Sequence, residues 1–195
     1  ADCADKTFFF GSERRKLKLF GEFNQENASG AFKAAELLGI SSKLINKVLS
    51  NFNGVVGRTT TLNFKDSKII IGKTDNIDAV AAVFNEVKMD VIIIGTPRKG
   101  EKFRYNILKE VSNAKPALVV LFPGLDNTTD IAEEILKAED YDGEVCVLNE
   151  VSEVVELALK CTNKYKNIFI GGNGQKKIMY IQKALNKLSH SNNIY

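Results

Sequence analysis

The chain has 195 residues, 27 basic and 24 acidic side chains, a formal net charge of +3 and 44% hydrophobic residues. This composition is that of an ordinary globular protein, and it excludes a disordered tail, a collagen-like fibre and a strongly basic nucleic-acid-binding arm. One histidine and three dispersed cysteines give no support to a Ser-His-Asp triad, a zinc site or a disulfide framework. No apolar run approaches the ~18 residues of a membrane-spanning helix. We therefore expect a cytoplasmic protein with no nucleic-acid or membrane partner.

The first third of the chain predicts two strands followed by two helices. Apolar runs on either side of a turn predict short strands over Lys6–Phe10 and Lys16–Phe20. Small residues at helical spacing predict a helix over Asn24–Leu38, and a serine cap predicts a second helix over 41–52. Two strands and two helices make a poor core of their own. We therefore expect residues 1–55 to be the end of a larger, truncated domain.

The remaining residues, 56–195, alternate between short apolar strands and amphipathic helices. The predicted strands are Ser67–Gly72, Asp90–Gly95, Ala117–Phe122, Glu144–Leu148 and Asn167–Gly171, and the predicted helices are Asn76–Val87, Glu101–Ser112, Thr128–Ala138, Ser152–Cys161 and Gln175–Leu188. Continuous apolar strands that alternate with helices predict βαβ units. The fold class is therefore α/β: a Rossmann-like, mostly parallel sheet with helices on both faces, preceded by a partial ββαα segment.

Four loops that follow these strands combine glycine with charged or polar residues, and they cover residues 72–76, 95–102, 123–127 and 171–177. Glycine lets backbone N–H groups approach a phosphate, and the next helix adds a partial positive charge. Neither GxxxxGK[ST] nor a GxGxxG fingerprint after the first strand occurs. Glycine is also routine in strand-to-helix turns. Together the loops favour an anionic ligand that the motifs do not identify.

The order of several motifs resembles the Mur ligase superfamily. The residues between Gly21 and Arg58 resemble its pattern of G-x-x-N-x-x-N-x-x-A, an Ala-rich helix, L-G-I, a second helix and F-x-G-V-x-G-R. Looser matches follow at Gly95–Arg104, which resembles a G-x-R-x-x-G-K-R loop, and at Gly171–Gln175, which stands where other members have G-K-G-H-E. The resemblance covers essentially the whole chain and is strongest over residues 16–58.

The resemblance implies an ATP-dependent ligase that forms ADP. In that family a carboxylate takes the γ-phosphate of ATP, and a nucleophile, usually an amine, attacks the acyl phosphate. The P-loop and the Mg²⁺ ligands belong to the central domain and are expected upstream of Ala1. Residues 1–55 would be the remnant of that ATPase domain and 56–195 the C-terminal Rossmann-like domain. This chain alone is expected to be inactive.

Four residues are carried over as candidate site residues. Asn24 and Asn27 match asparagines that lie on the adenine side of ATP in the family. Their side chains suit this role, because an amide can both donate to and accept from a base. Arg58 matches a hinge arginine that reaches the nucleotide phosphates. Lys73 matches a lysine near the γ-phosphate or acyl phosphate, and it is the candidate catalytic residue. No metal ligand is assigned within the chain.

The sequence also departs from the family pattern. Phe23 replaces a histidine, Ile71 replaces an acid, and Asn127-Thr128 replaces N-P-R, so the arginine that grips diaminopimelate-type substrates is absent. A standard peptidoglycan substrate is therefore not expected, although the partners remain a small-molecule or peptide-like carboxylate and a nucleophile.

Two classes of function stay open. The first is a ligase with a non-standard acceptor, such as an archaeal cell-wall peptide ligase, an amidoligase of the lipid II type, or the enzyme that closes a ring on the nickel tetrapyrrole coenzyme of methanogens. In that last reaction the nucleophile would be a carbon. The second class is a non-catalytic nucleotide-binding or interaction module with the same fold. A GxxGKT loop upstream of Ala1 would identify an enzyme.

Overall fold

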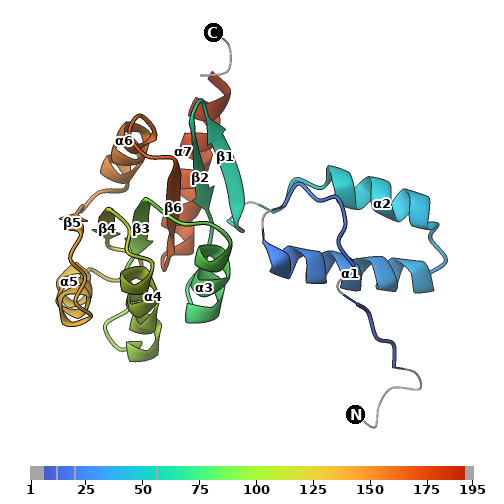
Figure 1. The fold of residues 1–195 in the computed structure, drawn as a ribbon, viewed down its shortest axis with the longest axis horizontal. Helices are drawn as coiled ribbons and strands as arrows, with labels where there is room; N and C mark the ends of the chain where they lie inside the picture. The colour runs from blue at the N-terminus through green and yellow to red at the C-terminus, as the bar shows by residue number, and fades with distance from the viewer. Residues whose placement is uncertain (1–6, 12, 20, 56, 192–195) are drawn as a thin grey trace. The chain divides into compact units, whose positions relative to one another are not determined.

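A computed structural model describes residues 7–11, 13–19, 21–55 and 57–191, without the side chains of residues 190 and 191. The chain forms two compact units, Ala1–Gly54 and Val55–Tyr195 (Figure 1).

The first unit contains the two expected helices, α1 at Glu22–Leu37 and α2 at Ser42–Asn51, with Ser41 as the N-cap of α2. The two expected strands, 6–10 and 16–20, are wrong. Their described residues, 7–10 and 16–19, run as irregular chain, whereas residues 6 and 20 lie outside the described part.

The backbone of this segment pairs with a side chain of α1 instead of with a second strand. Arg15 N donates to Gln25 Oε1 at 2.8 Å, and Gln25 Nε2 donates back to Arg15 O at 3.1 Å. The Arg15 guanidinium also lies 3.7 Å from the ring centroid of Phe32. An isolated two-stranded hairpin is marginal in water, so these helix contacts replace it.

The second unit is a six-stranded sheet covered by helices. Its strands are β1 (Thr60–Phe64), β2 (Ser67–Ile71), β3 (Val91–Gly95), β4 (Leu118–Phe122), β5 (Glu144–Val147) and β6 (Asn167–Gly172). Its helices are α3 (Ile77–Glu86), η1 (a 3₁₀ helix, Lys102–Asn106), α4 (Ile107–Asn113), α5 (Thr129–Ala138), α6 (Val151–Thr162) and α7 (Gln175–Ser191). The strand order is β1-β2-β6-β3-β4-β5, and all neighbours are parallel except β1 and β2. The predicted α/β fold with a mostly parallel sheet is confirmed.

The core lies on both faces of this sheet. One face packs against α6 and α7, whose apolar residues join those of β2, β3, β4 and β6 in a single buried cluster. On the other face Phe169 of β6 meets Phe84 of α3, with ring centroids 5.1 Å apart, and α3, α4 and α5 are neighbours (Figure 1). The four central strands are almost entirely buried, as their continuous apolar runs predict. Within the described residues, every helix is too short or too polar to cross a bilayer.

Two elements of this unit differ from the prediction. Strand β1 was not predicted, although Leu62 and Phe64 are buried while Asn63 between them is exposed, which is a strand alternation. It forms the antiparallel edge, with Phe64 opposite Ser67 across a tight turn. The helix expected over 101–112 begins as the 3₁₀ turn η1 and becomes α-helical only at Ile107.

Candidate functional site

The candidate site lies at the edge of the sheet where β2, β3, β4 and β6 end. The register places Ile71 opposite Ile170, and Gly95 opposite both Gly172 and Phe122. The loops that follow these strands therefore meet at one edge. Open parallel sheets bind their ligands at this edge.

Lys73 lies in the loop that joins β2 to α3, and both ends of that loop are fixed. Gly72 N donates to Ile170 O at 3.1 Å, and the buried hydroxyl of Thr74 accepts from Gly172 N at 3.1 Å. At the far end the Asn76 side chain accepts from Ala79 N at 2.9 Å and caps α3. The backbone of Lys73 thus has one defined position on the sheet edge.

The structure brings Lys73 close to the segment that carries Arg58. Lys73 N donates to Gly57 O at 3.1 Å, and a Cβ built on Gly72 would lie 2.7 Å from the carbonyl carbon of Arg58. Arg58 itself is exposed, and none of the ion pairs between described residues involves it. These two predicted site residues therefore stand on adjacent segments.

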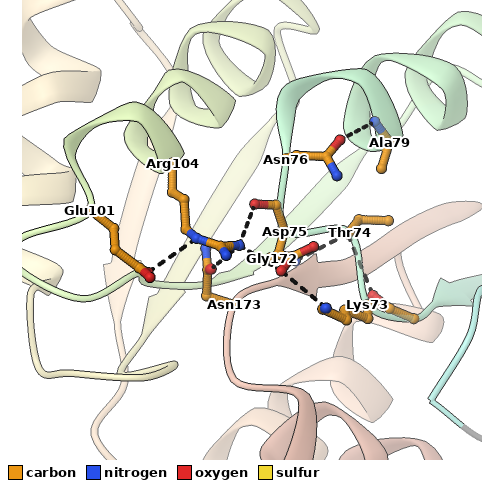
Figure 2. A network of polar contacts seen from close by, with 10 residues as sticks. Lys73, Thr74, Asp75, Asn76, Ala79, Glu101, Arg104, Gly172 and Asn173 are labelled. Carbon is orange, nitrogen blue, oxygen red and sulfur yellow. Dashed lines mark hydrogen bonds and ion pairs between the residues drawn. The ribbon is translucent and has the colours of Figure 1, made fainter.

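The Lys73 ammonium belongs to a network of charged side chains from the segments after β2 and β3, which the amide of Asn173 after β6 joins (Figure 2). Its Nζ lies 3.2 Å from Asp75 Oδ2, and Arg104 Nη1 lies 2.5 Å from the same oxygen. Arg104 Nη1 also donates to Asp75 O at 3.1 Å and to Asn173 Oδ1 at 3.4 Å. Arg104 Nε pairs with Glu101 Oε2 at 3.1 Å, at an angle that does not make a hydrogen bond. Two cations and two carboxylates are thus held together without net charge.

Asp75 is ionised in this setting. Partial burial raises the pKa of Asp75, but the hydrogen bonds and charges of Arg104 and Lys73 outweigh that effect and hold the pKa of this carboxyl below its ordinary value. The carboxylate is therefore a permanent anion between the two cations at neutral pH.

Contacts between the loops account for glycines that the sequence associated with an anion. A Cβ on Gly124 would lie 2.4 Å from Thr96 O and 2.6 Å from Asn173 O. Gly172, at φ +85°, would place a Cβ 2.6 Å from Gly95 O. These glycines let three loops pack backbone against backbone, and this packing brings Asn173 to Arg104.

Asn24 and Asn27 belong to the first unit, on α1. Asn27 is exposed and lines a groove of about 600 Å³ together with Phe10, Glu26 and Gly30. Gly30 leaves room for the Phe10 ring, since a Cβ there would lie 3.2 Å from it. Asn24 is half-buried in the first turn of α1, where its N–H donates to Gly21 O at 3.0 Å.

Sequence reasoning missed Asp75, Glu101, Arg104 and Asn173 as members of the site. The available signal was that each follows a buried strand, where the chain reaches the carboxyl edge of the sheet.

Among the described residues, no three His, Cys, Asp or Glu side chains are grouped so that they could hold a metal ion.

Comparison with known proteins gives sequence and fold relatives. No family model matches the chain. It is 30% identical over 169 residues to the UDP-N-acetylmuramoyl-L-alanyl-D-glutamate–L-lysine ligase of Streptococcus agalactiae, covering 81% of this chain and 34% of that protein. It is 26% identical over 178 residues to the corresponding 2,6-diaminopimelate ligase of Fusobacterium nucleatum, covering 84% and 36%. The chain thus spans about a third of the length of these relatives.

Solved structures share the fold. The folylpolyglutamate synthase of Thermotoga maritima aligns with a TM-score of 0.69 at 18% identity, over 94% of this chain and 42% of that one. A pseudomurein peptide ligase type C from Methanothermus fervidus aligns with a TM-score of 0.60 at 24% identity, over 88% and 37%. The motifs between Gly21 and Arg58, the Rossmann-like sheet and these sequence relatives agree, and the chain belongs to the Mur ligase superfamily.

Proposed function

We propose that this chain is the C-terminal portion of an ATP-dependent, ADP-forming ligase that activates a carboxylate as an acyl phosphate and joins it to a nucleophile. The observation that carries the proposal is the 30% identity to a lysine-adding ligase over 169 residues. The proposal includes a cytoplasmic location, where ATP is supplied.

In this proposal residues 1–55 are the remnant of the central ATPase domain and residues 56–195 are the C-terminal domain. The division into units at Gly54 and Val55 agrees with this assignment. The P-loop and the Mg²⁺ ligands would then lie in the rest of the protein, and this chain alone would not turn over ATP.

The first unit offers a place for the adenine ring. The groove beside Asn27 has a volume within the usual range of ligand sites, about 300–1,000 Å³. Phe10 on its wall is 58% exposed and offers a ring face for stacking, and the amide of Asn27 can recognise a base by donating and accepting. Asn24 does not line this groove but lies one turn earlier on α1, and we assign it to the adenine side on the family resemblance alone. We assign the adenine to this groove.

The second unit would supply two cations to the phosphates. Arg58 is exposed and able to reach an anion with its planar guanidinium, and Lys73 offers an ammonium at the carboxyl edge of the sheet. We assign the nucleotide phosphates to Arg58 and the transferred phosphoryl group to Lys73. Asn127 and Thr128 replace the arginine-bearing motif of peptidoglycan ligases, which favours an acceptor other than diaminopimelate.

The test uses the full-length protein that carries this chain. ADP release is measured with ATP, Mg²⁺ and pairs of carboxylate and amine, including UDP-N-acetylmuramoyl-L-alanyl-D-glutamate with L-lysine. Lys73→Met is expected to lower kcat and kcat/KM together, because the lost interaction is made to the transferred group. The matched control is Lys65→Met, an exposed lysine in the turn between β1 and β2.

An unchanged kcat in Lys73→Met removes this lysine from the reaction. No ADP release for any pair would contradict the ligase. Binding of a fluorescent ATP analogue would then support a non-catalytic nucleotide-binding module, and failure to bind it would support an interaction module.

A further inference from the structure

We propose that Asp75 is a positioning residue, which fixes the Lys73 ammonium through a relay that runs from Glu101 and Asn173 through Arg104. This inference rests on the proposed function, because it concerns how the lysine is held for the reaction. The relay lies within one compact unit and is drawn in Figure 2.

A lysine at the edge of a sheet needs such support. Its side chain has a flexible four-carbon stem and loses rotamer entropy when it is held still. The backbone of Lys73 is fixed by Gly57 O, but the only ion pair of its Nζ among the described residues is the one with Asp75, at 3.2 Å. Asp75 therefore decides where the ammonium lies.

Asp75 can do this because it is itself held by Arg104. The Arg104 Nη1 group contacts both Oδ2 and the backbone oxygen of Asp75, at 2.5 and 3.1 Å, so the guanidinium is anchored on the main chain beside the carboxylate and loses its contact with Oδ2 if the carboxylate rotates away. The side chains of Asp75 and Arg104 are only 18% and 24% exposed, so solvent screens their pair less than a surface pair.

Arg104 is held in turn by residues from two sides. Glu101, one turn earlier, pairs with its Nε, and Asn173, which is 1% exposed, accepts from its Nη1 at 3.4 Å. Asn173 cannot shift freely, because its N–H donates to Gly95 O at 2.8 Å. The relay thus ties the ammonium to loops that follow β2, β3 and β6.

This arrangement leaves Lys73 able to act on an anion. An ammonium has three N–H donors, and its one ion pair among the described residues, with Asp75 Oδ2 at 3.2 Å, leaves two of them for other acceptors. These two point away from Asp75 by the tetrahedral geometry of the nitrogen. A phosphoryl oxygen would meet an ammonium whose place is already set, so little order has to be created during the reaction.

The experiment is a double-mutant cycle in the full-length protein with Lys73→Met, Asp75→Asn and the double variant. Asp75→Asn is expected to lower kcat about tenfold with the KM for ATP within about twofold, and to add less than about twofold in the Lys73→Met background. Asp75→Glu is expected to restore part of kcat, because it keeps the charge. The matched control is Asp78→Asn, on the exposed first turn of α3.

The outcomes separate the two proposals. A full kcat in Lys73→Met overturns the assigned role of the lysine. The positioning role alone is overturned if Lys73→Met lowers kcat but Asp75→Asn keeps a full kcat. It is also overturned if the effects of the two substitutions on kcat multiply in the double variant, as independent effects do.

A second measurement on this 195-residue chain needs no activity. When a lysine side chain is held in one conformation, its two Hε protons have different NMR chemical shifts. We expect the two Hε shifts of Lys73 to become equal in Asp75→Asn and in Arg104→Lys. The rest of the spectrum should stay unchanged, which shows that the fold is retained. Distinct shifts in both variants would overturn the relay.

Discussion

Gly57 links the start of the second unit to the loop that carries Lys73. Its carbonyl accepts from Lys73 N at 3.1 Å, while its own N–H donates to the buried Gln182 side chain of α7 at 2.8 Å. Its φ of +87° is a backbone conformation that glycine adopts readily. The residue that follows, Arg58, is therefore held beside the sheet edge.

Arg58→Ala in the full-length protein is expected to raise the KM for ATP and to slow acyl-phosphate formation, because an exposed guanidinium near the phosphates is lost. Thermal stability should stay nearly constant, since Arg58 is exposed and has no ion pair with a described residue, and even an exposed ion pair contributes only about 0–1 kcal/mol. Steady-state kinetics and a thermal melt check both parts. Arg58→Lys should recover part of the ATP affinity, and wild-type kinetics in Arg58→Ala would remove this residue from the site.

This chain by itself is expected to fold but to release no ADP from ATP. The positioning and charge stabilisation that phosphoryl transfer needs would come from the rest of the protein, whereas the sheet of the second unit has its own core. Circular dichroism and a coupled ADP assay with a no-protein control test this. Turnover that EDTA abolishes would contradict the domain assignment.

Gly124→Ala is expected to lower the free energy of unfolding by about 1–3 kcal/mol, because the new methyl group meets two backbone oxygens that cannot move independently. Urea unfolding of this chain measures the change. Gly100→Ala is the matched control, since a Cβ at that position has nothing within 4 Å. Equal stability of the two variants would show that the loops around Gly124 can move apart at little cost in free energy.

The ion pairs of Asp75 are expected to be lost only in acid. Because the folded-state pKa of this carboxyl lies below its ordinary value of 3.8, its stabilisation is present above that value and is lost as the pH falls through the folded pKa. Wild type should exceed Asp75→Asn in unfolding free energy by a constant amount from pH 5 to 8, and the difference should shrink below about pH 4. Urea titrations at several pH values test this. If the difference in unfolding free energy between wild type and Asp75→Asn grew in acid, the folded-state pKa of Asp75 would not be lowered.

The sequence determined the elements whose burial follows a local period. Strands such as Val91–Gly95 and Leu118–Phe122 are buried on both faces, so their continuous apolar runs identified them, and the helices between them carried apolar residues at helical spacing. The resemblance between Gly21 and Arg58 likewise pointed to the family that the comparisons then supported.

The tertiary structure decided the rest, because the deciding contacts join residues far apart in the chain. The hairpin expected before α1 is absent from the described residues. The backbone N–H and C=O of Arg15 form hydrogen bonds with the side chain of Gln25, ten residues later, instead of with a second strand. The relay at the sheet edge depends on Arg104, which is 29 residues from Asp75 and 69 from Asn173. A local pattern can place each residue after a strand, but only the order of the strands in the sheet brings the three side chains together.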